Sequence, residues 1–280
     1  MNIDLFQSLI ERANKADGSG YIDLAISAVR CGSDGQMLWQ HALVHAMFWA
    51  RLGAATLPDT ANLISLADVL TAYAVDARLR GSIEQADYIG AQAIYRLEQA
   101  SQLGGEDAAA LLSAAADKLS PAAISMAKLW QTNGRSEDIV AEDACLAAAA
   151  KGDAHAIGQV FDAALQTTLT AVLDAEDAVA LLGIIATFGQ ATGDETLIVR
   201  YAGVLLMLAE YRGKVRRTDE DRWQQSAEAL RLLATMADRN TVGAADYLKT
   251  AIAIVDPQAV AIVAKERPDI LGSTNCAGSC

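Results

Sequence analysis

Bulky and rigid residues are scarce in this chain of 280 residues. Aromatic residues make up 5% of it, and there are only four prolines. Strands are enriched in aromatic and β-branched residues, whereas alanine, about a fifth of this sequence, is the strongest helix former. No stretch alternates apolar and polar residues in the way of a half-buried strand. The composition therefore argues against a sheet-based fold and predicts closely packed helices.

The sequence also lacks an excess of positive charge and long apolar runs. The net charge of −13 disfavours binding to phosphate backbones and to anionic lipid surfaces. The longest apolar runs, such as 178–188, are too short and too closely flanked by charge to span a bilayer. The first fifteen residues have the pattern of an amphipathic helix and not that of a signal peptide. We therefore expect neither a nucleic-acid nor a membrane partner.

Cysteine is scarce and scattered. Only Cys276 and Cys280 are neighbours, and their spacing is neither that of a CxxC pair nor that of a prenylation box. Cys31 and Cys145 lie in apolar helical stretches, where buried and unreactive thiols are expected. A reducing, bacterial-type cytoplasm is the simplest setting for this pattern.

Helix start signals, by contrast, are abundant. Ser120-Pro121 and Asp256-Pro257 each place a capping oxygen before a proline at the first helical position. Thr218 and Asp221 have the spacing of a capping box. Further N-cap candidates are Asp59, Ser136, Asp174 and Asn240. Acids near helix starts face the helix dipole, and this explains acidic clusters that would otherwise suggest paired catalytic carboxylates.

These signals predict about fourteen helices joined by short connections, so that neighbours run antiparallel. The expected fold is an all-α superhelix, or solenoid, of antiparallel helical hairpins. It would form one domain over 1–265, followed by a loosely ordered tail over 266–280. The predicted helices span 3–16, 20–31, 35–54, 60–80, 84–103, 106–118, 121–133, 137–151, 154–172, 175–190, 194–212, 219–238, 241–254 and 257–265.

A spacing of small residues, AxxZxxxAAxxG, recurs along the chain, where Z stands for a variable residue. It appears at 42–53, 93–104, 141–152 and 178–189, and in a weaker form at 227–238. Small residues at i, i+7 and i+8 lie along one helix face and allow a neighbouring helix to approach closely. The final glycines, at positions 53, 104, 152 and 189, are expected to end their helices in a left-handed turn.

The best copy lies within 122–156 and extends to a longer pattern. Its first part has Ala122, Met126-Ala127, Trp130 and Gly134, and its second has Ala141, Ala148-Ala149 and Gly152. This segment resembles a Sel1-like repeat, a relative of the tetratricopeptide repeat, with Ala144 where that family prefers tryptophan. The resemblance implies a helical-repeat adaptor whose concave face holds a peptide or a partner domain.

His41 and His45 lie one helical turn apart, which is the spacing of a zinc-binding pair. The residue after the first histidine is Ala42, where a metalloprotease has its glutamate base. His45 also falls on the variable position of the repeated spacing, which indicates a packing role. The alternative is an all-α hydrolase or lyase that uses a metal at His41 and His45.

One basic cluster interrupts this acidic sequence, between two predicted helices. It consists of Arg212, Lys214, Arg216 and Arg217. It is either a solvated loop balanced by the acids that follow it or a docking point for an acidic partner. The tryptophans, Trp130 among them, are expected in the core or along a groove that holds a partner.

Motifs for catalysis are absent: the sequence has no phosphate-binding loop, glycine fingerprint or GxSxG elbow. We therefore predict a non-catalytic scaffold, without a cofactor, that binds a peptide or protein partner in a helical groove. The basic cluster and Trp130 are the predicted partner-binding residues. The partner is expected to be acidic if the basic cluster takes part.

Overall fold

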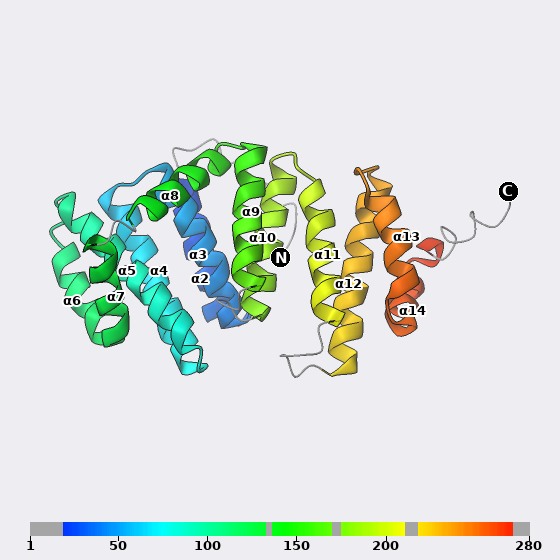
Figure 1. Cartoon of the computed structure of the whole chain (residues 1–280), viewed down its shortest axis with the longest axis horizontal. Coiled ribbons are helices and arrows are strands. Elements are labelled where there is room, and N and C mark those ends of the chain that lie inside the picture. Colours follow the sequence, from blue (N-terminus) through cyan, green and yellow to red (C-terminus); the bar gives the residue numbers. More distant parts are fainter. Residues whose placement is uncertain (1–18, 133–135, 170–174, 211–217, 271–280) are drawn as a thin grey trace. The chain divides into compact units, whose positions relative to one another are not determined.

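The computed structural model describes residues 19–132, 136–169, 175–210 and 218–270 (Figure 1). Within these ranges the chain forms thirteen α-helices and no strand, so the predicted all-α fold is confirmed. The first predicted helix, 3–16, lies outside the described residues. The helices are α2 (Ser19–Ser33), α3 (Trp39–Thr56), α4 (Thr60–Leu79), α5 (Ile83–Gln102), α6 (Ala108–Lys118), α7 (Pro121–Thr132), α8 (Ser136–Ala150), α9 (Ala154–Leu169), α10 (Ala175–Ala191), α11 (Thr196–Glu210), α12 (Asp219–Asp238), α13 (Ala244–Ile254) and α14 (Pro257–Glu266).

Capping side chains begin several helices where the sequence predicts them. The Asp59 carboxylate accepts a hydrogen bond from the backbone N–H of Asn62 at 2.8 Å, at the start of α4. The hydroxyl of Ser120 accepts from the N–H of Ala123 at 3.0 Å, at the start of α7. Thr218 forms the predicted capping box of α12, and Asp256 caps α14.

One predicted cap is wrong. Asn240 has a φ of 57° and follows the end of α12, and the residue that precedes α13 is Gly243. Asparagine tolerates the left-handed region, which suits the end of a helix as well as a turn. The helix predicted over 35–54 is also displaced, because α3 begins at Trp39 and continues to Thr56.

Contacts between Cα atoms divide the chain into two compact units, Met1–Ile184 and Ile185–Cys280, with the boundary inside α10. In the first unit α2 packs against α3, α3 against α4, and α4 against α5, while α6 and α7 pack against α5. Helix α8 lies obliquely over this row and packs against α3 and α9 (Figure 1). In the second unit α12 packs against α11, α13 and α14. A single domain over 1–265 and a continuous superhelix stay predictions.

Each unit has its own apolar core. In the first unit the rings of Tyr21 and Trp49 are stacked with centroids 6.1 Å apart, and both side chains are buried. The Tyr21 hydroxyl donates to the backbone carbonyl of Ala150 at 2.9 Å and so ties α2 to the end of α8. Burial raises the pKa of Tyr21 to about 12, so this donor keeps its proton at neutral pH. In the second unit Leu230 and Leu233 of α12 are fully buried.

The repeated spacing ends in two kinds of glycine. Gly104 and Gly152 have φ values of 85° and 84°, and each follows its helix by one or two residues, as predicted. A Cβ added to either glycine would meet nothing within 4 Å, so only their backbone conformation favours glycine.

The other two glycines do not end their helices, and that prediction is wrong. Gly53 and Gly189 lie inside α3 and α10, and neither has a positive φ. A Cβ at Gly53 would lie 2.8 Å from Cδ1 of Ile22, and one at Gly189 would lie 2.5 Å from Cδ1 of Leu197. These positions are small because another side chain packs directly against the helix, and the left-handed glycine after α10 is Gly193.

A buried polar network joins α10 to α3 and α4. The side chain of Asp177 is fully buried and accepts hydrogen bonds from Gln40 at 2.6 Å, from the Tyr73 hydroxyl and from Arg80 at 3.0 Å. Arg80 also pairs with Asp76 at 2.8 Å. Burial and the neighbouring Asp177 raise the pKa of Tyr73, so its hydroxyl stays protonated and donates. Because Asp177 is buried, its carboxylate cannot be hydrated, and these three donors take the place of water.

The chain beyond α14 is packed further than predicted. Arg267 forms ion pairs with Asp238 at 2.9 Å and with Asp269 at 2.6 Å, and Ile270 is buried. The chain therefore stays packed as far as Ile270, and the rest of the predicted tail, 271–280, lies outside the described residues. None of the helices in the described ranges combines the length and apolar character that a membrane span requires.

The two kinds of glycine should respond differently to asparagine. We expect Gly53→Asn to lower the free energy of unfolding by about 1–3 kcal/mol, because the new side chain overpacks Ile22. Gly152→Asn should lower it by less than about 1 kcal/mol, since asparagine tolerates a positive φ and has open space there. Urea unfolding followed by circular dichroism measures both, and equal losses would contradict the assignment.

Removing the buried carboxylate should destabilise the first unit. We expect Asp177→Ala to lower the free energy of unfolding by about 3–5 kcal/mol, because Arg80 and Tyr73 lose a buried acceptor. Asp76→Ala is the matched control: it removes the more exposed acid and leaves Asp177 on Arg80, and about 1 kcal/mol is expected. Thermal or urea unfolding compares the two, and a control as damaging as Asp177→Ala would refute the role of burial.

Candidate functional site

The predicted partner-binding residues divide between undescribed and buried positions. Arg212, Lys214, Arg216 and Arg217 lie outside the described residues. Trp130 is 5% exposed, and its ring packs edge-to-face on Tyr88 with centroids 5.5 Å apart. In this conformation the Trp130 ring belongs to the contact between α5 and α7 and does not line a groove.

The histidine pair is not surrounded by further metal ligands. Among the described residues no three histidine, cysteine, aspartate or glutamate side chains gather as a metal site would require. Burial, together with the smaller effect of the nearby His41, lowers the pKa of His45 to about 4. His45 is therefore neutral at physiological pH, and its environment is that of a packed side chain.

Cys145 does not have the environment of an activated nucleophile. Cys31 and Cys145 are free thiols and half-buried. Burial raises the pKa of Cys145, and the carboxylates of Glu142 and Asp153 raise it further. A reactive cysteine needs the opposite shift, toward the thiolate.

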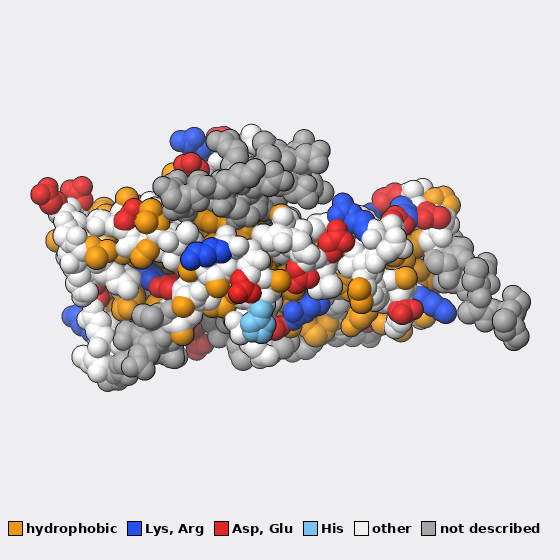
Figure 2. Space-filling view, turned by 90° about the horizontal axis from the view of Figure 1, so that it is seen from above, with side chains coloured by type: hydrophobic (Ala, Val, Ile, Leu, Met, Phe, Trp, Pro, Cys, Tyr) orange, Lys and Arg blue, Asp and Glu red, His pale blue; other side chains and the backbone are white. Residues whose placement is uncertain are grey.

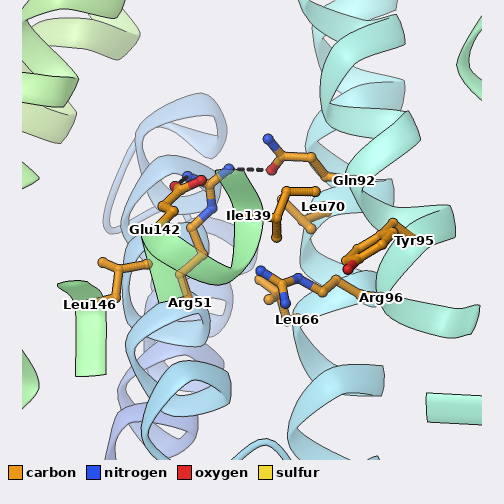
Figure 3. A pocket seen from close by; sticks show the side chains of 9 residues that line it. All are labelled: Arg51, Leu66, Leu70, Gln92, Tyr95, Arg96, Ile139, Glu142 and Leu146. Carbon is orange, nitrogen blue, oxygen red and sulfur yellow. Dashed lines mark hydrogen bonds and ion pairs between the residues drawn. The ribbon is translucent and has the colours of Figure 1, made fainter. Parts of the chain in front are cut away.

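A different polar cluster draws three helices of the first unit together. We call it the arginine site: it consists of Arg51 of α3, Gln92 and Arg96 of α5 and Glu142 of α8, which are drawn in Figure 3, together with Asp143 of α8. Arg51 donates to Glu142 at 3.1 Å and to the amide oxygen of Gln92. Arg96 forms two parallel hydrogen bonds to Asp143, at 2.7 and 2.6 Å. Two adjacent carboxylates of α8 thus pair with two arginines from separate helices.

Neighbouring side chains of its own helix, α5, orient Arg96 closely. Its guanidinium also donates to Gln99 at 3.0 Å and lies 5.8 Å from the centroid of the Tyr95 ring. Residues 92, 96 and 99 share one face of α5, because they are spaced by four and three positions. The Arg96 side chain is only 9% exposed, whereas that of Glu142 is 45% exposed. In each ion pair the arginine side chain is therefore the more buried partner, and the acid of α8 is the more exposed one.

The arginine site encloses little free space. Figure 3 shows the side chains around a cavity of about 10 Å³, which is room for about one water molecule. Apolar residues from α4 and α8 complete its lining: Leu66, Leu70, Ile139 and Leu146. No substrate fits there while α8 is in place, so the site is at present a contact between charged helices.

An open groove lies next to the arginine site, on the other side of Tyr95. It has a volume of about 430 Å³ and is lined by Tyr95, Glu98, Gln99 and Gln102 of α5 and by Gln131 of α7. Burial raises the pKa of Glu98, which accepts a hydrogen bond from Gln131. We call this the glutamine groove. Its amides carry both a donor and an acceptor, and it is accessible from solvent.

The sequence contained a partial signal for these residues. Arg96 occupies the variable position of the repeated spacing, where other copies have histidine, alanine or leucine, and an arginine on a helix face that packs is unusual. Nothing in the sequence predicted its partner, because Asp143 lies 47 positions away.

The surface shows no comparable concentration of charge on the face drawn in Figure 2. Among the described residues of that face, acidic, basic and apolar side chains are interspersed. Comparison with known proteins adds no identification, since no family model, curated protein or solved structure matches the chain.

The lowered pKa of His45 predicts a pH dependence of stability. Between about pH 6.5 and pH 4 the unfolded chain binds a proton at this position and the folded chain does not. The free energy of unfolding should therefore fall by up to about 3 kcal/mol as the pH decreases through this range, and His45→Leu should remove that part of the fall. Urea unfolding at a series of pH values measures it, and parallel curves for the two proteins would contradict the shift.

Proposed function

We propose that this protein is a non-catalytic scaffold that binds a peptide or protein partner in the glutamine groove. The supporting observation is the groove of about 430 Å³ between α5 and α7. Peptide backbones present N–H donors and C=O acceptors, and glutamine amides can satisfy both kinds of group. The lining residues therefore suit an extended polypeptide better than a compact apolar ligand.

The proposal also agrees with the resemblance of 122–156 to Sel1-like repeats, whose proteins are adaptors. Gln131 belongs to that segment and contributes to the groove. A reducing, bacterial-type cytoplasm fits the free thiols of Cys31 and Cys145. The groove replaces Trp130 as the expected contact surface, because the Trp130 ring is buried.

Selection from a displayed library of random peptides tests this function without knowledge of the natural partner. We expect enriched peptides whose binding, measured by fluorescence anisotropy, is weakened at least about tenfold by the double variant Gln102→Lys/Gln131→Lys. The two lysines remove the amide groups and fill part of the groove.

Gln36→Lys is the matched control, because Gln36 is exposed in the turn between α2 and α3, away from the groove. It should leave binding unchanged. A library that yields no binders, or binders equally affected by both changes, would count against the glutamine groove.

A further inference from the structure

We propose that α8 occupies, within the same chain, a binding site for an acidic amphipathic helix, and that a partner helix with the same pattern displaces it. The inference rests on the proposed scaffold function and names the class of partner. Its basis is the arginine site, in which α8 already supplies the ligands that such a partner would supply.

The chemistry of the arginine site selects carboxylates. Arg96 binds Asp143 with both nitrogens of its planar fork, at 2.7 and 2.6 Å, and this geometry matches a carboxylate better than a neutral acceptor. Arg51 directs one nitrogen to Glu142 and the other to Gln92. If α8 left, both guanidinium groups would lose a carboxylate partner, so an occupant with two acids is favoured over an empty site.

The α8 residues at the site define the expected pattern. Ile139, Glu142, Asp143 and Leu146 are spaced at i, i+3, i+4 and i+7 and therefore share one helix face. Ile139, Glu142 and Leu146 line the cavity beside Leu66 and Leu70 of α4. A partner helix that presents two consecutive acids between two apolar residues would reproduce these contacts.

The two ends of α8 are held differently. Of the side chains described up to Asp143, none is buried, and Glu142 is 45% exposed. Toward its C-terminal end, Leu146, Ala149 and Ala150 are buried, and the carbonyl of Ala150 accepts from the Tyr21 hydroxyl. Glu142 and Asp143 are thus held by the two arginines, which would equally bind the acids of an equivalent partner. The partner's second apolar residue would take the place of Leu146, while Ala149 and Ala150 keep the end of α8 in place.

Such an arrangement lowers the affinity for the partner in the resting protein. The apparent dissociation constant equals the intrinsic value divided by the fraction of molecules whose site is open. A change that drives α8 from the arginines should therefore strengthen binding of an external acidic helix, although it removes no groove residue.

The direct probe is a fluorescently labelled synthetic peptide with the sequence of residues 136–150. We expect it to bind the full-length variant Glu142→Lys/Asp143→Lys at least tenfold more tightly than the wild-type chain, in fluorescence anisotropy titrations. Glu106→Lys/Asp107→Lys is the matched control: it changes an identical, exposed Glu-Asp pair before α6 and should bind like the wild type. Circular dichroism checks that each variant keeps its helical content.

Charge exchange then tests the assigned contacts. The double variant Arg51→Glu/Arg96→Glu, made in the otherwise wild-type chain, repels the native acids of α8; it should not bind the acidic peptide and should bind a peptide in which Glu142 and Asp143 are replaced by lysine. A purely structural role for the arginines would not produce this rescue. Should the lysine variant fail to fold, Glu142→Gln/Asp143→Asn opens the site without adding charge, and a gain of at least threefold is expected.

The inference is overturned if the opened variant binds the peptide no better than the wild type, or if a peptide with Glu142→Gln/Asp143→Asn binds equally well. Displayed-library binders that still depend on Gln102 and Gln131 would then leave the scaffold function standing. If the opened variant does not bind the peptide and the library also yields no binder that depends on Gln102 and Gln131, both the displacement of α8 and the scaffold function are refuted.

Discussion

Close packing of helices through alanine is the constraint on which the rest of this structure depends. Buried alanines lie along the contact faces of most described helices, for example Ala42, Ala50, Ala93 and Ala227, all fully buried. An alanine side chain removes little apolar area from water, at about 25 cal/mol per Å², so each contact contributes modestly. It also carries no shape that would fix one register over another. Stability therefore accumulates from many small contacts, and a few large side chains, such as Trp49, determine the register in which the helices pack.

Polar pairs that cross between helices supply much of the missing specificity. Asp177 collects donors from α3 and α4, and the Arg96–Asp143 pair joins α5 to α8. In the second unit Arg231 of α12 binds Glu266 of α14 at 2.8 Å. Each pair connects positions at least 35 residues apart. The first two of these pairs contain buried or half-buried charges, which tolerate few alternative arrangements because displacement leaves them without a partner. In an alanine-rich core this requirement selects the observed packing.

This division of roles explains what the sequence could and could not predict. Helix boundaries were predictable because capping is local: Asp59, Ser120 and Thr218 each bond to a backbone group three residues away. The glycine at the end of the repeated spacing was not, since Gly53 and Gly152 occur in the same local pattern. What separates them is Ile22, which packs on Gly53 from a preceding helix.

The arginine site was invisible for the same reason. Its members are ordinary residues on amphipathic helices, and their meaning arises only from tertiary contact. The sequence suggested an acidic partner from the basic cluster at 212–217, whereas the described structure offers Arg51 and Arg96 as an alternative basis for the same charge preference. Trp130 was singled out for its size, yet size also makes a tryptophan valuable in a core that is short of aromatic residues.

The position of α8 unites these features. A helix held only by large apolar side chains would be difficult to exchange, because any substitute must match its shape. Helix α8 combines two ion pairs with Ile139, Leu146 and a row of alanines, a pattern that another amphipathic helix can reproduce. Because the chain has few large side chains, charged pairs set the register of its helices. For the same reason α8 is the helix that the proposed partner can replace. In the proposed mechanism the chain fills its arginine site with its own acids, and the affinity for a partner helix is set by competition with a segment that is always present.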